Sequence, residues 1–240
     1  MAELIVKNLA GIYLNEDFLS LVEKYANLPK GRVLLVFSDG PLVKNRYGQC
    51  IPKSFRKYAP ASTKVYYPFY DTDWVCGVAL SLESCLMRKD FPAFFTYLLG
   101  HELGHAYICL SDMNLHIFCC LIKDFFYKVA PNKISWVHEF PHEKRFDQFG
   151  IYIAEHLFSR NKINNEIRDL LKDPSREDHE WLKFMLSLES INTFDDLNDS
   201  LISLVKPYKD KLIEFWKKNI IDKKGNSIAC EIDDFGTLFE

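Results

Sequence analysis

Apolar and polar residues follow a helical period over the middle of the chain, most regularly in residues 92–110. Apolar side chains recur there at every third or fourth position, which places them on one face of an α-helix. Asp90 can cap such a helix, and Pro92 fits in its first turn. We therefore predict a long helix whose apolar residues enter the core: Phe94, Phe95, Leu98, Leu99, Leu103, Ala106, Tyr107 and Leu110.

Further helical patterns fill the rest of the chain after residue 110. Residues 113–129 form one apolar helical stretch, and another begins after Pro141 and runs to about residue 158. Residues 161–218 read as several amphipathic helices separated by breaks at residues 173–174 and at Pro207. The C-terminal part is therefore predicted to be mainly helical.

The first ninety residues predict most of the β-structure. Residues 4–25 have helical spacing and predict an opening helix, whereas residues 32–37, 64–70 and 74–82 read as short strands. We expect an α+β fold in which a small twisted β-sheet packs on the helix over residues 92–110. Residues 1–160 would form the first domain, and residues 161–240 a helical extension packed on it.

Composition and net charge bear on which partners and which cellular compartment we expect. Among the 240 residues, 48% are hydrophobic and the formal net charge is −3, which gives no electrostatic reason to expect nucleic acid or a membrane surface as a partner. No stretch approaches the roughly 20 apolar residues of a membrane span, and no secretory signal is visible. We expect a cytoplasmic protein, whose oligomeric state the sequence leaves open.

Three titratable residues interrupt the apolar helix at HELGH. Residues four apart on a helix share a face, so His101 and His105 can both direct a ring nitrogen at one zinc ion. Glu102 lies about 100° round the helix, where it can reach a water molecule on that metal. Gly100 and Gly104 each weaken the helix by about 1 kcal/mol, which indicates a close approach by another element. The competing interpretation is an incidental polar patch on a half-exposed helix.

A hydrolytic zinc site needs a third protein ligand and an open position. A metzincin would carry glycine and histidine three and six residues after the second histidine, but this chain has Ile108 and Ser111 there, so that class is excluded. The remaining candidates for the third ligand are His116, His138, His142, Glu143, Asp147 and His156.

The predicted helix over residues 141–158 favours Glu143 as the third ligand. Glu143 and Asp147 share one face with the small residues Gly150 and Ala154, so this helix could lie close to the HELGH helix. Asp147 could accept the outward N–H of a ligating histidine and fix its orientation. The alternatives are an amphipathic helix whose acids face water, and His142 as a substitute ligand.

This motif layout resembles a known group of enzymes. HELGH followed about forty residues later by Glu-x-x-x-Asp resembles the gluzincin arrangement, and EKRFDQFGIYIAEHL resembles a helix of the ImmA/IrrE-type metallopeptidases. The resemblance covers roughly residues 74–158. It implies a metallopeptidase-like first domain in which His101, His105 and Glu143 bind zinc and Glu102 is the general base. Asp147 would contact these ligands without binding the zinc itself.

The leading hypothesis is therefore a zinc-dependent metallopeptidase acting on a peptide or protein. Glu102 would take a proton from a zinc-activated water that attacks the peptide carbonyl. An oxyanion-stabilising residue is also expected, and the sequence does not choose among Tyr107, His138, His142 and Tyr152. The alternatives are a catalytically silent metal-binding module with a regulatory or interaction role, and a zinc hydrolase with a non-peptide substrate.

Overall fold

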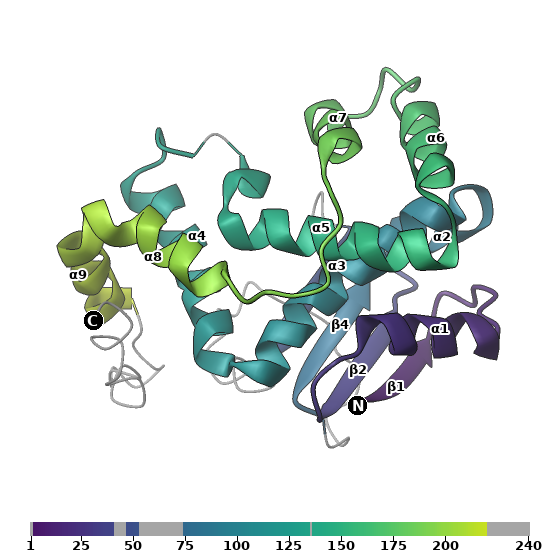
Figure 1. Ribbon diagram of the computed structural model, residues 1–240, viewed down its shortest axis with the longest axis horizontal. Coiled ribbons are helices and arrows are strands. Elements are labelled where there is room, and N and C mark those ends of the chain that lie inside the picture. The colour runs from purple at the N-terminus through teal and green to yellow at the C-terminus, as the bar shows by residue number, and fades with distance from the viewer. Residues whose placement is uncertain (1, 41–46, 53–73, 135, 220–240) are drawn as a thin grey trace.

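The computed structural model describes residues 2–40, 47–52, 74–134 and 136–219, and it has the expected α+β architecture (Figure 1). The described strands are β1 (Glu3–Asn8), β2 (Arg32–Phe37), β3 (Gly48–Pro52) and β4 (Cys76–Leu80). The described α-helices are α1 (Glu16–Ala26), α2 (Leu82–Asp90), α3 (Pro92–Ser111), α4 (Met113–Val129), α5 (Pro141–Leu157), α6 (Arg160–Leu170), α7 (His179–Ser187), α8 (Leu197–Val205) and α9 (Lys209–Asn219). Two 3-10 turns, η2 (Val137–Glu139) and η3 (Lys206–Tyr208), precede α5 and α9.

The four described strands form one mixed sheet in the order β1-β2-β4-β3. β1, β2 and β4 run parallel, whereas β3 pairs antiparallel with β4. The apolar strands β2 and β4 are almost entirely buried, as expected for central strands of a covered sheet. One face of the sheet packs on α1 and α3, through residues such as Phe18 and Phe95, and forms the main core.

The long helix α3 lies at the centre of the molecule and crosses α5 at very short distance. A Cβ atom placed on Gly100 would lie 2.8 Å from the Cα atom of Gly150. A Cβ atom placed on Gly150 would lie 2.6 Å from the carbonyl oxygen of Tyr97. Both distances are shorter than side chains tolerate, so only glycine permits this contact. The predicted close approach of the two helices is thus confirmed.

The helices after residue 160 share the core with the earlier part of the chain. α6 and α7 pack against Phe94, Tyr97 and Leu98 of α3, whereas α8 and α9 lie beside α4 (Figure 1). Phe91 provides no side-chain cap for α3, but Glu166 of α6 accepts a hydrogen bond from the Phe94 N–H at 2.8 Å. The extension therefore stabilises the first turn of the helix that carries HELGH.

The predicted secondary structure needs correction in the first ninety residues. The helix expected over residues 4–25 is wrong in its first half, where β1 pairs with β2 before α1 begins at Glu16. The strand expected over residues 74–82 is shorter, because Ser81 caps α2 and ends it. β3 and α2 were not expected, and the strand expected over residues 64–70 lies outside the described residues.

Within the described segments, none of the helices combines the length and the apolar composition that crossing a bilayer requires.

Candidate metal centre

Two neighbouring helices bring three ligand-type side chains together. His101 and His105 lie one turn apart on α3, and Glu143 lies in the first turn of α5. Oε2 of Glu143 is 3.4 Å from Nε2 of His101 and 3.7 Å from Nε2 of His105. One ligand atom from each residue lies within 4.8 Å of the other two.

The spacing of these atoms suits a tetrahedral metal ion. Zinc ligands at roughly 2.0–2.1 Å from a tetrahedral centre are separated from one another by about 3.3 Å. The two histidine-to-carboxylate distances, 3.4 and 3.7 Å, come close to this value. Imidazole nitrogen and carboxylate oxygen are also ligands that zinc accepts. His101, His105 and Glu143 could therefore hold a metal ion.

Asp147 fixes the orientation of His101 from one turn further along α5. Its Oδ1 atom lies 2.8 Å from Nδ1 of His101 and also accepts a hydrogen bond from the Tyr97 hydroxyl. Its Oδ2 atom lies 2.7 Å from Nδ1 of His138. Burial would raise the pKa of Asp147, but the imidazoles of His138 and His101 lower it to about 2. The charged carboxylate therefore binds Nδ1 of His101 and leaves Nε2 directed at Glu143.

Glu143 carries its charge in a buried position. Its side chain is only 4% exposed, and its Oε1 atom lies 2.5 Å from Nζ of Lys123 on α4. Burial raises the pKa of Glu143, but Lys123 and then His105 lower it far below its usual range. The competing interpretation, in which the acids of this helix face water, is therefore wrong for both Glu143 and Asp147.

Glu102 also lies in the protein interior, beside strand β3. It is 7% exposed, and among the described residues its Oε2 atom has no hydrogen-bond partner. A Cβ atom placed on Gly48 would lie 2.8 Å from Oε1 of Glu102, so the strand touches this carboxylate. Burial raises the pKa of Glu102. A carboxylate in this setting holds a proton more readily than one in water.

The other histidines near the site occupy different positions. His142, the predicted substitute ligand, is fully buried, and its Nε2 atom lies 3.7 Å from Oε1 of Glu143, on the oxygen that faces Lys123. The His116 ring lies 6.0 Å from the His105 ring, and its Nε2 atom approaches the Cys120 thiol at 3.9 Å. Neither residue belongs to the three-residue group found among the described side chains.

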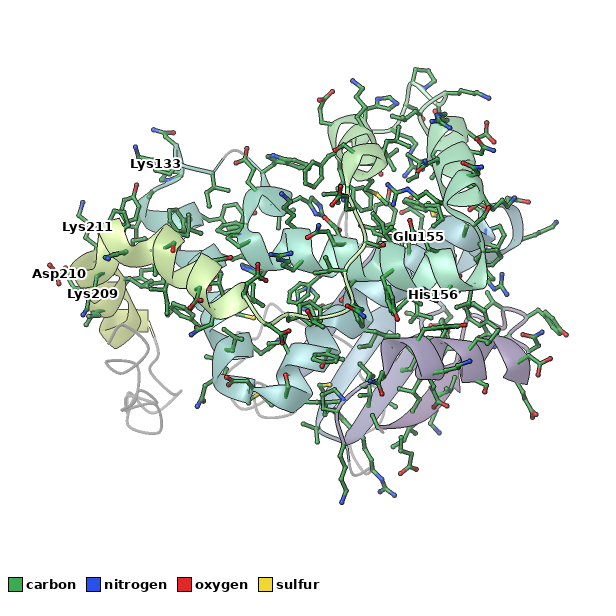
Figure 2. The ribbon with its side chains drawn as sticks, in the orientation of Figure 1. Lys133, Glu155, His156, Lys209, Asp210 and Lys211 are labelled. Carbon is green, nitrogen blue, oxygen red and sulfur yellow. The ribbon has the colours of Figure 1, made fainter. Side chains whose placement is uncertain are left out.

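Two predicted tyrosines and one histidine have their contacts elsewhere. His156 packs on Tyr25 of α1 and on Tyr152, at the end of α5 that faces α1 (Figure 2). Tyr107 packs on Phe194, with ring centroids 5.2 Å apart. These contacts give no support to Tyr152 or Tyr107 as oxyanion-stabilising residues or to His156 as a ligand.

Sequence reasoning missed two residues of the site. Tyr97 lies one turn before His101 on α3, so its helical spacing could have indicated a shared face. Lys123 comes from α4, and no local pattern signals its contact with Glu143 twenty residues away.

Comparison of the chain with protein-family models, with curated proteins and with solved structures gave no match. The resemblance to the ImmA/IrrE-type metallopeptidases thus stays a prediction based on the motif residues. What the structure adds is a group of two partly buried histidines and a buried glutamate that could hold a metal ion.

Proposed function

We propose that this protein is a zinc-dependent metallopeptidase that hydrolyses a peptide bond. The observation that carries the proposal is the group of His101, His105 and Glu143, whose spacing fits a tetrahedral metal ion. A bound zinc ion would supply Lewis acidity toward water and toward a carbonyl oxygen.

The number and exposure of the ligands favour a catalytic over a structural site. Structural zinc sites are usually closed by four protein ligands, often cysteines, whereas catalytic sites use three and keep one position open. Three ligand residues are grouped in the described part of the chain. The side chains of His101 and His105 are 12% and 14% exposed, so the site is not fully closed off from solvent.

Glu102 is the residue proposed as general base. It follows His101 directly on α3, so its carboxylate lies beside the ligand pair without joining it. Burial raises the pKa of Glu102 above that of an exposed carboxylate, which makes this side chain a better proton acceptor. In the proposed reaction Glu102 accepts a proton from the attacking water and delivers it to the departing amine.

The position of β3 supports a peptide substrate. β3 is one of the two edge strands of the described sheet, and Gly48 in it touches Glu102, which β1 at the opposite edge does not. An extended peptide can add to such a strand through main-chain hydrogen bonds, which would bring its backbone alongside the proposed base.

Metal content and cleavage measured on the same preparations test the proposal. Purified wild-type protein is expected to contain about one zinc per chain and to cleave an unfolded protein or members of a quenched peptide library. Glu102→Gln should retain the zinc and lose cleavage, since Gln keeps the size of the side chain but cannot act as a base. Glu23→Gln, at an exposed position on α1, serves as the matched control and should cleave like the wild type.

Two outcomes would contradict the proposal. Cleavage by Glu102→Gln at the wild-type rate would exclude Glu102 as the base. One bound zinc with no cleavage of any library member would favour the alternative, a catalytically silent metal-binding module.

A further inference from the structure

The two carboxylate oxygens of Glu143 face different partners. Oε2 is directed at the histidine pair, 3.4 Å from His101 Nε2 and 3.7 Å from His105 Nε2. Oε1 is in contact with the ammonium group of Lys123, at 2.5 Å. Because the Glu143 side chain is 4% exposed and begins in the first turn of α5, its packing restricts exchange of the two oxygens.

Lys123 reaches this carboxylate from a helix that supplies none of the three grouped residues, His101, His105 and Glu143. It lies on α4, and its side chain is 24% exposed, so its ammonium group enters a mostly enclosed site. A charged carboxylate as buried as Glu143 is costly unless a partner of opposite charge satisfies it. Lys123 provides such a partner on the side of Glu143 that faces away from the two imidazoles.

We propose that Lys123 is a positioning residue of the metal site: it neutralises Oε1 of Glu143 and so presents Oε2 alone to a cation held with His101 and His105. This inference rests on the metal site of the proposed function. Glu143 then acts as a one-oxygen ligand. The ammonium group also gives Glu143 a counter-ion whether or not a metal ion is bound, at the expense of repelling a divalent ion nearby.

Lys123→Met tests this inference, because methionine fills similar space without the charge. In the metal-free protein the variant leaves Glu143 buried without its ammonium partner, which should lower the melting temperature. Zinc should then raise the melting temperature of the variant by more than it raises that of the wild type. The association constant for zinc should increase at least about tenfold, since the repulsion between ammonium and metal is lost.

The measurements use the full chain, stripped of metal with a chelator and titrated with zinc chloride alone. Thermal unfolding measures the metal-induced rise in melting temperature. Competition with a chromophoric chelator measures the association constant for zinc. Cobalt(II) in place of zinc adds a spectroscopic readout. Its visible absorption weakens as the coordination number rises, so the freed Oε1 joining as a second ligand oxygen should weaken that absorption in Lys123→Met.

Matched variants separate this role from a general effect of losing a lysine. Lys128→Met removes a lysine of the same helix whose ammonium pairs with Asp124 at the surface. This variant should change neither the metal-induced rise in melting temperature nor the association constant for zinc. Lys123→Arg keeps the positive charge and should behave like the wild type. In a Glu143→Gln background, Lys123→Met should leave the cobalt absorption unchanged, because the side chain at 143 then has no second carboxylate oxygen that could join the metal.

Two results would overturn the inference. One is a cobalt absorption in Lys123→Met equal to that of the wild type. The other is a metal-induced rise in melting temperature equal to or smaller than that of the wild type, with unchanged zinc affinity. If Lys123→Met does not fold even with zinc, Lys123→Gln takes its place with the same expectations. No zinc-induced rise in the wild type would instead refute the metal site itself, and the inference with it, so the two failures are told apart.

Discussion

The Nδ1 atom of His101 lies 2.8 Å from the Oδ1 atom of Asp147, and this contact joins α3 to α5 across the candidate metal centre. The same carboxylate binds Tyr97 and His138, so it is fixed from three directions. The ring of His101 is therefore held with its other nitrogen directed at Glu143 before any ligand arrives.

Asp147→Asn is expected to weaken zinc binding by roughly 10–100-fold, the usual effect of losing a residue that orients a metal-bound histidine. Asparagine retains the size of the side chain but loses the charge that fixes the tautomer of His101. Chelator competition on the purified protein measures the change. An affinity equal to that of the wild type would show that this contact does not orient the ligand.

The third ligand can be identified by comparing two adjacent residues. Glu143→Gln should lower zinc affinity by more than Asp147→Asn does, because it alters a ligand atom directly. His142→Asn should bind zinc nearly as well as the wild type, since His142 approaches Glu143 on the oxygen that faces Lys123. Elemental analysis after dialysis measures both variants. A larger loss of zinc in His142→Asn than in Glu143→Gln would assign the third ligand to His142.

Gly150→Ala should destabilise the fold although alanine favours helices. The added methyl group would lie 2.6 Å from the Tyr97 carbonyl oxygen and 2.9 Å from the backbone nitrogen of His101, so α3 and α5 must move apart. We expect a net loss of about 1–3 kcal/mol in the free energy of unfolding, measured with urea. Gly40→Ala, where an added Cβ meets nothing within 4 Å, should change it little.

Glu166→Ala should weaken the first turn of α3, although Glu166 lies 72 residues after Phe94 in the chain. It removes the acceptor of the Phe94 N–H and should lower the free energy of unfolding by about 0.5–2 kcal/mol, as the loss of a helix cap does. Glu166→Gln keeps an acceptor oxygen and should lose less. Glu180→Ala, at a site whose side chain is 83% exposed, is the control. Equal stability of Glu166→Ala and wild type would refute the capping role.

The central helices and the candidate ligand group were predictable because their signals are local. The helical period gave the start of α3 and both ends of α4, and four-residue spacing grouped His101 with His105. The four-residue spacing of Glu143 and Asp147 placed both carboxylates on one face of α5, which predicted the part of the site that this helix contributes. Helical geometry alone fixes these relationships.

The parts that were missed depend on distant partners. β1 has three consecutive apolar residues that also suit a helix, and only its parallel pairing with β2 decides for a strand. β3 contains both glycine and proline, which strands disfavour, and it is a strand through its ladder with β4. Lys123 has no sequence signal because its contact with Glu143 depends on how α4 packs beside α5.

The crossing at Gly100 and Gly150 has a consequence for metal selectivity. Because the candidate ligands are divided between α3 and α5, the distance between the two backbones sets the space that an ion between them would have. Gly100 directly precedes His101, so a small displacement of the backbone at Gly100 also moves the imidazole of His101. Attempts to make this centre prefer a larger cation should therefore begin by widening the crossing and leave the liganding residues unchanged.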